Sequence, residues 1–171
     1  MEPEEVIAQV KARARANFRA GLNCAESVFL AVISVVDTGL PSETMCLMTG
    51  FGGGGGHFGD TCGALAGAMA ALGAVYGRRE IPPDPKTGRE QMHGEPGLYR
   101  LFNRLPNEFQ RRFGSTQCRV LTAPWVKTWL CREHISFCRH LTIEAAGLAA
   151  EMAFPKDLPR WGSGPFGEHH P

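Results

Sequence analysis

Apolar residues recur at helical spacing through most of the chain, and residues that start or stop helices bound each run. The first run begins at Pro3 with two glutamates after it, which suit a first helical turn, and ends at Gly21. Asn23 can cap a second helix over 24–36, in which small and branched apolar residues share one side. The valine-rich end of that segment, 32–36, also fits a short buried strand, but no nearby segment alternates to pair with it.

The later segments continue the helical pattern. Further helices are predicted over 43–51, 62–76, 98–113 and 133–152. Pro106 is expected to kink or break the third of these. The Pro/Gly-rich connection over 78–97, about 20 residues, has a length typical of a functional or mobile loop. With no strands alternating with helices and no internal repeat, the pattern predicts one all-α domain, a helical bundle over 1–154, followed by an irregular C-terminal tail over 155–171.

The stretch GFGGGGGHFGDTCGALAGAMAALGAVYG, residues 50–77, carries unusually little side-chain volume. Glycines with unrestricted φ let a backbone approach a bulky group or turn its N–H groups toward an anion. Behind Cys62, the small residues Gly63 and Gly67 form a ridge that favours close helix packing. A phosphate-binding loop is the main competitor, but no Lys-Ser/Thr pair follows the glycines and no clear strand precedes them. A flexible linker is the plain structural alternative.

Composition and charge narrow the classes of partner. A chain of 171 residues can bury a core without a metal or disulfide to hold it folded. Its 18 basic and 17 acidic residues nearly cancel, which argues against nucleic acid and anionic membranes as partners. The N-terminus has no apolar segment of the secretory type, and the weakly polar run 62–77 is too short to span a bilayer. We therefore expect a soluble, cytoplasmic protein.

Six cysteines are the main candidates for chemistry, because thiols stay reduced in the cytoplasm and there serve metal or catalytic roles more often than disulfides. Cys24 and Cys62 lie where helices are predicted to begin, and a helix N-terminus stabilises a thiolate. Cys138 shares the apolar face of the last helix, so its sulfur should point inward. Cys46 is interpreted as core. Any single cysteine can also be a plain buried side chain, and the chain has no Cys-x-x-Cys motif.

Histidines and tryptophans add less to the interpretation. His57, between the glycines and Cys62, can ligate a metal or carry a proton, although a loop histidine is more often only solvated. His134 and His140 flank Cys138 and are expected at the surface or at a helix end, with metal ligation as the alternative for His134. Trp129, like Trp125, is most simply a core residue.

Four stretches carry a family resemblance: GLNCAESVFLAV, GFGGGGGHFGDTCGALAGAMAALG, FGSTQCRVL and CRHLTIEAAGLAAEM. They resemble the redox-active C_GCAxxG_C_C proteins, a family named for its cysteine pattern and related to part of the split-Soret cytochromes. The resemblance covers about 21–152 and implies a helical domain whose cysteines serve redox chemistry by holding an iron–sulfur cluster. The motif carries over to Cys24, to Cys62 with Gly63, Ala64 and Gly67, then to Cys118 and Cys138. Cys131 competes for the last position, and haem attachment motifs are absent.

Three hypotheses follow from these residues. In the first, Cys24, Cys62, Cys118 and Cys138 ligate an iron–sulfur cluster in an electron-transfer protein with an unidentified redox partner protein. Its cofactor-binding loop comprises Gly53, Gly54, Gly55, Gly56, His57 and Gly63. In the second, Cys62 is the low-pKa attacking thiol of a metal-free thiol–disulfide protein. In the third, four cysteines hold a structural zinc ion. The Ala/Gly helix faces also favour a homodimer.

Overall fold

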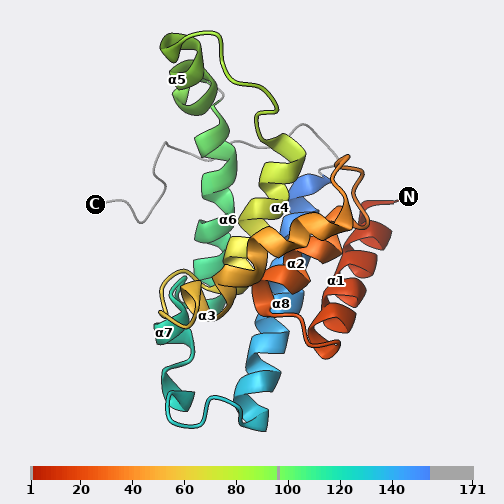
Figure 1. Cartoon of the computed structure of the whole chain (residues 1–171), viewed down its shortest axis with the longest axis vertical. Helices are drawn as coiled ribbons and strands as arrows, with labels where there is room; N and C mark the ends of the chain where they lie inside the picture. The colour runs from red at the N-terminus through yellow and green to blue at the C-terminus, as the bar shows by residue number, and fades with distance from the viewer. Residues whose placement is uncertain (1, 96, 155–171) are drawn as a thin grey trace.

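The computed structural model describes residues 2–95 and 97–154, and within these ranges the chain folds into helices without a strand (Figure 1). The α-helices are α1 (Pro3–Arg19), α2 (Cys24–Ile33), α3 (Gly52–Gly55), α4 (Gly63–Tyr76), α5 (Pro85–His93), α6 (Leu98–Phe113), α7 (Cys118–Leu121) and α8 (Arg132–Ala153). Two 3-10 helices, η1 (Ser42–Phe51) and η2 (Ala123–Trp125), complete the order. The prediction of an all-α fold is confirmed.

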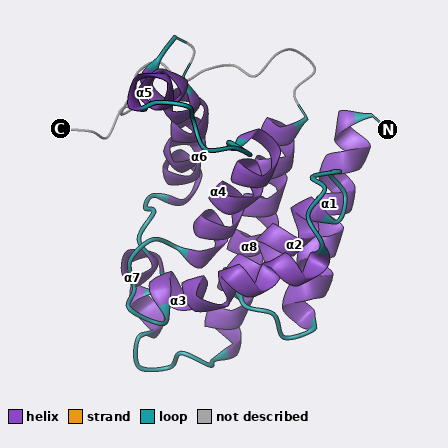
Figure 2. Cartoon of the chain, turned by 45° about the horizontal axis from the view of Figure 1, so that its top comes forward, coloured by secondary structure: helices purple, strands orange, loops and turns teal. Residues whose placement is uncertain are grey.

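The core lies where α1, α2, α4 and α8 pack against one another, and α6 covers one side of α4 and α8 (Figure 2). Fully buried aliphatic side chains fill this region, among them Val10, Val28, Leu72 and Leu148. At Gly67 an added Cβ would collide with the backbone of Ala25, so the small residue allows α4 to approach α2 closely. The predicted ridge therefore does bring two helices together at this position.

The start of α2 is fixed by its cap, as the sequence predicts. The Asn23 side chain accepts hydrogen bonds from the backbone N–H groups of Ala25 and Glu26, and Glu26 accepts one from the Asn23 N–H at 2.9 Å. The Asn23 amide also donates to the Thr49 carbonyl at 3.0 Å, and the Thr49 hydroxyl donates to Glu26 at 2.6 Å. These bonds tie the end of η1, and so the beginning of the glycine run, to the first residue of α2, Cys24.

Several boundaries differ from prediction. The α2 helix ends at Ile33 rather than 36, and 42–51 is a 3-10 helix. Residues 85–93, predicted as loop, form α5, since Pro85 suits the first turn and the Asp84 side chain accepts from the Lys86 and Thr87 N–H groups. Pro106 does not break α6, because Leu101, Leu105 and Phe109 anchor it on both sides of the proline.

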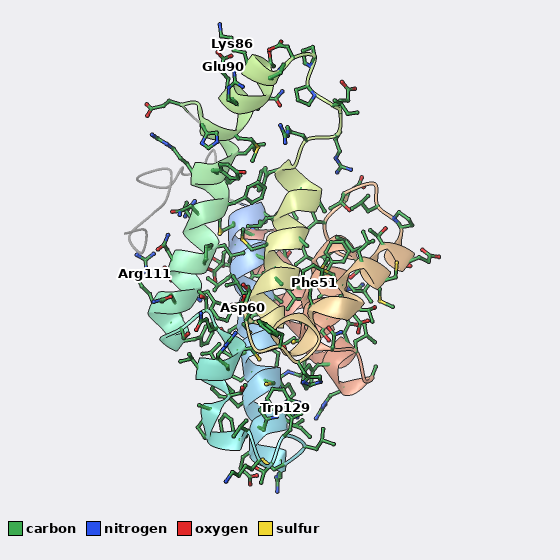
Figure 3. The ribbon with its side chains drawn as sticks, turned by 60° about the vertical axis from the view of Figure 1, so that its left-hand side comes forward. Phe51, Asp60, Lys86, Glu90, Arg111 and Trp129 are labelled. Atoms are coloured by element: carbon green, nitrogen blue, oxygen red, sulfur yellow. The ribbon has the colours of Figure 1, made fainter. Side chains whose placement is uncertain are left out.

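The molecule has two unlike ends. In Figure 3, Lys86 and Glu90 mark the α5 end, where the helix buries none of its own residues, and Trp129 marks the opposite end. Among the helices of 2–95 and 97–154, none is long and apolar enough to cross a membrane. The predicted tail, 155–171, lies outside the described residues.

Candidate functional site

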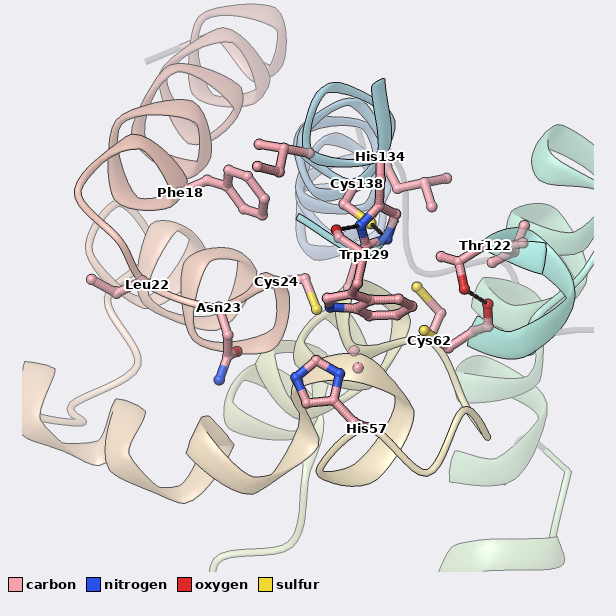
Figure 4. Close-up of a pocket in the computed structure, with 18 of the residues that line it drawn as sticks. Phe18, Leu22, Asn23, Cys24, His57, Cys62, Thr122, Trp129, His134 and Cys138 are labelled. Atoms are coloured by element: carbon pink, nitrogen blue, oxygen red, sulfur yellow. Dashed lines mark hydrogen bonds between the residues drawn. The ribbon is translucent and has the colours of Figure 1, made fainter. Parts of the chain in front are cut away.

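A pocket of about 330 Å³ lies at the end of the bundle away from α5, and the four predicted cysteines line it. They come from four separate segments: Cys24 begins α2, Cys62 precedes α4, Cys118 begins α7 and Cys138 lies in the second turn of α8. Figure 4 shows Cys24, Cys62 and Cys138 around this space, with Trp129 and His57 beside it. We call it the cysteine pocket. Its cysteines span more than a hundred residues of sequence, so only the folded chain brings them together.

The glycine run places Cys62 next to Cys118. Gly54 has a left-handed backbone (φ 74°), and a Cβ there would lie 2.7 Å from the Asp60 nitrogen and 2.8 Å from the Cys118 Cβ. Beyond this tight turn the Cys118 N–H donates to the Asp60 carbonyl at 2.7 Å, and the Cys62 N–H donates to the Thr116 carbonyl at 2.8 Å. This short antiparallel pairing joins two segments that each carry a pocket cysteine.

Close packing explains why the residue after Cys62, Gly63, has no side chain. A Cβ at this position would collide with the Cys24 sulfur and with the Phe51 carbonyl oxygen, 2.8 Å away. The first turn of α4 can therefore lie against the first turn of α2 only if residue 63 has no side chain. The absence of a side chain beside Cys62 leaves space for the sulfur of a second cysteine. This close approach of backbone to sulfur explains part of the glycine-rich sequence.

Backbone N–H groups face the sulfurs, as the helix N-termini predict. Burial raises the pKa of both Cys24 and Cys62, and hydrogen bonds from backbone N–H groups, first those of Gly53 and Ala25 to Cys24 and of Leu65 and Ala64 to Cys62, offset part of this rise. Burial outweighs these bonds, however, and raises the pKa of Cys62 to about 12. The prediction of a low pKa at Cys62 is therefore wrong. Removing a thiolate from water costs more free energy than the N–H groups at the helix N-terminus supply by stabilising it.

The four thiols also oppose one another's ionisation. Burial, followed by the charges of Cys24, Cys62 and Cys118, raises the pKa of Cys138 to about 12. Burial raises the pKa of Cys118, the nearby Thr122 side chain offsets part of this rise, and the Cys24 charge adds to it. Mutual repulsion of this kind means that four thiolates can exist here together only with positive charge between them.

His134 was expected at the surface or at a helix end. It lies in the first turn of α8, as the second alternative has it, but it is 4 % exposed and lines the pocket, so the surface alternative is wrong. Its Nε2 lies 3.2 Å from the Cys138 sulfur, and its Nδ1 makes a short hydrogen bond with the Trp129 carbonyl. The i,i+4 spacing of His134 and Cys138, which puts both on one helix face, is the sequence feature that would have found it.

Aromatic rings border the pocket on one side. Trp129, predicted as core, is only half-buried and lines the pocket, with its ring centroid 4.2 Å from that of His134 and 5.1 Å from that of His57. Next to it, Leu130 lines the same pocket yet is 83 % exposed. The loop between η2 and α8 thus gives the cysteine pocket an apolar, partly open rim.

The remaining predicted site residues divide into two groups. Gly53, Gly56, His57 and Gly63 line the pocket, whereas Gly54 is buried behind its lining and Gly55 is exposed and not part of it. Cys131 lies outside the pocket: it is the N-cap of α8, and its sulfur accepts a hydrogen bond from the His134 N–H at 3.5 Å. Cys46 is exposed on η1, so its assignment to the core is wrong, since this 3-10 helix buries only Met48.

The donor set of the pocket is four thiols. Over 2–95 and 97–154, no three His, Cys, Asp or Glu side chains are arranged to hold one metal ion. Four cysteine thiolates are the ligands that iron–sulfur clusters and some zinc ions take, so the residue types around the pocket fit either group.

Comparison with known proteins gives one match. The model of a family described as "Putative redox-active protein (C_GCAxxG_C_C)" matches residues 22–152, a range that contains all four pocket cysteines. No curated protein and no solved structure matches the chain.

Proposed function

Because the chain belongs to the C_GCAxxG_C_C family of redox-active proteins, we propose that it is a small electron-transfer protein with an iron–sulfur cluster in the cysteine pocket. The observation that carries the proposal is the convergence of Cys24, Cys62, Cys118 and Cys138, from four segments, on one pocket. These four would be the thiolate ligands. Bound there, the cluster would supply a centre that gains and loses single electrons.

The surroundings of the sulfurs support this choice. The pKa of each of the four thiols is raised, so a group that binds them as thiolates must bring positive charge, as iron does. N–H groups of Gly53, Ala64 and Leu65 already point at Cys24 or Cys62, and such hydrogen bonds to ligand sulfurs tune a cluster's potential. The chain's own part is to bind the cluster, shield it from water and orient these donors.

The two alternatives fit less well. A thiol–disulfide protein needs an attacking thiolate at neutral pH, whereas a pKa of about 12 keeps Cys62 protonated. A structural zinc site usually takes its cysteines as close pairs such as Cys-x-x-Cys, and this chain has no such pair.

The proposal is tested by analysing protein purified without oxygen for iron, acid-labile sulfide and zinc, together with an ultraviolet-visible spectrum. We expect stoichiometric iron and sulfide with a thiolate-to-iron charge-transfer band, lost in Cys62→Ser and kept in Cys46→Ser, which alters an exposed cysteine outside the pocket. Unchanged iron and sulfide in Cys62→Ser would overturn the ligand assignment. Protein free of iron but with bound zinc, or with rapid alkylation of Cys62, would favour the corresponding alternative.

A further inference from the structure

The ring of His134 is held in one orientation. Its Nδ1 bonds the Trp129 carbonyl, its face packs against the Trp129 indole at a centroid distance of 4.2 Å, and Trp125 lies 5.7 Å away. A carbonyl oxygen only accepts hydrogen bonds, so Nδ1 carries the ring proton. In the neutral ring, Nε2 therefore carries the lone pair, and inside the cysteine pocket it accepts a hydrogen bond from the Cys138 thiol at 3.2 Å.

This arrangement matches that of a metal-binding histidine. Such residues nearly always donate the other ring N–H to a carboxylate or a backbone carbonyl, which fixes the tautomer and aims the free nitrogen. Two donors bound to one tetrahedral ion, at about 2.3 Å for sulfur and about 2.0 Å for nitrogen, lie roughly 3.5 Å apart. His134 Nε2 and Cys138 Sγ are 3.2 Å apart in their hydrogen bond, so a metal that replaces the thiol proton between them needs only a small movement of either side chain.

We propose that His134 binds the metal group of the cysteine pocket through Nε2, at the same iron as Cys138. The bond forms from the Nε2 lone pair. The Cys138 thiol proton is released to solvent as its sulfur binds, the other ring proton stays on Nδ1 in its hydrogen bond to the Trp129 carbonyl, and no electron is transferred. This inference rests on the proposed cluster. His134 is then a fifth protein ligand beside the four thiolates.

The experiment is pulsed electron paramagnetic resonance on the reduced, cluster-loaded protein, with and without ¹⁵N-histidine. Of the histidines that the structure describes, His57 and His134 line the pocket, so His57→Gln removes the other candidate nitrogen, and His140→Gln, on α8 outside the pocket, is the control. We expect a strongly coupled histidine nitrogen in the wild type, in His57→Gln and in His140→Gln, and its loss in His134→Gln. Because nitrogen ligands raise a cluster's reduction potential, that potential should also fall in His134→Gln and stay unchanged in His140→Gln.

The outcomes separate this inference from the proposed function. Loaded protein without a strongly coupled nitrogen, or with one that persists in His134→Gln, overturns the role of His134 and leaves the cluster in place. If His134→Gln fails to load, the ¹⁵N shift in His57→Gln still decides, because that variant retains His134 as the described pocket histidine. A wild-type protein that binds neither iron nor sulfide overturns both proposals.

Discussion

The two halves of α4 line two regions that are both buried from water but have opposite chemistry, an aliphatic core and the cysteine pocket. Toward its C-terminal end, α4 contributes Ala68, Ala71 and Leu72 to an aliphatic core, where burial stabilises the fold. At its N-terminal end, Cys62 is 5 % exposed beside the other thiols, where burial opposes ionisation. Burial therefore stabilises the fold in the aliphatic core. In the cysteine pocket it keeps the thiols protonated unless a positively charged group binds them.

The largest expected effect on stability comes from removing a core side chain. Phe109→Ala deletes a fully buried ring, and we expect a loss of about 3–5 kcal/mol in the free energy of unfolding, since the cavity cannot collapse. Phe58→Ala, at a ring 73 % exposed, should change stability by less than about 0.5 kcal/mol. Urea unfolding followed by circular dichroism measures both. Equal losses of unfolding free energy in the two variants would contradict the conclusion that the buried core stabilises the fold.

The second change acts on the pocket through one methyl group. Gly63→Ala places a Cβ against the Cys24 sulfur, so we expect a loss of about 1–3 kcal/mol in stability and reduced iron binding. Gly73→Ala, on the same helix but with no described atom within 4 Å of the new methyl, should stabilise the protein by about 0.5–1 kcal/mol. Denaturation and iron content distinguish them. A Gly63→Ala protein that binds iron normally would contradict the close packing at Cys24.

The third test uses pH on metal-free protein. The pKa of Cys62 is raised from its ordinary value of 9.0 to about 12 in the fold, so the unfolded chain loses this proton first as pH increases. Stability should therefore be retained below pH 9 and fall above it, by at most about 1.4 kcal/mol per pH unit for each such thiol. Below pH 9, iodoacetamide should label the exposed Cys46 well before Cys62. Faster labelling of Cys62 would restore the thiol-nucleophile hypothesis.

The smallest expected effect comes from the cap that holds the pocket's first cysteine. Asn23→Ala removes the acceptor for the Ala25 and Glu26 N–H groups and should cost about 1 kcal/mol, with weaker iron binding because Cys24 follows directly. Asp84→Ala removes the equivalent cap from α5, at the far end of the molecule, and should leave iron binding unchanged. Iron content after gel filtration compares the two variants. Equal losses of iron in the two variants would mean that a lost helix cap weakens iron binding by destabilising the whole protein and not by moving Cys24.

Much of the helical framework was readable from local sequence. Asn23 caps α2 and the segment 63–76 forms one helix, because caps, periodicity and glycine act over a few residues. The errors have different causes. Pro106 does not break α6, because core residues on both sides hold the helix. Residues 85–93 form a helix from local signals, the Asp84 cap and Pro85, which the Pro/Gly-rich composition of the connection obscured. The glycines marked the region of the site without revealing what they approach.

By itself, the sequence determined the helical periodicity, the caps and the family of the chain, since each depends on residue types at fixed spacing. Only the tertiary structure decided which sulfurs meet. Cys138 lines the pocket and Cys131 caps α8, although both are cysteines at the start of one helix. The same packing buried His134 and raised the pKa of Cys62, because dehydration and the approach of distant charges exist only after the segments at 24, 62, 118 and 138 have come together.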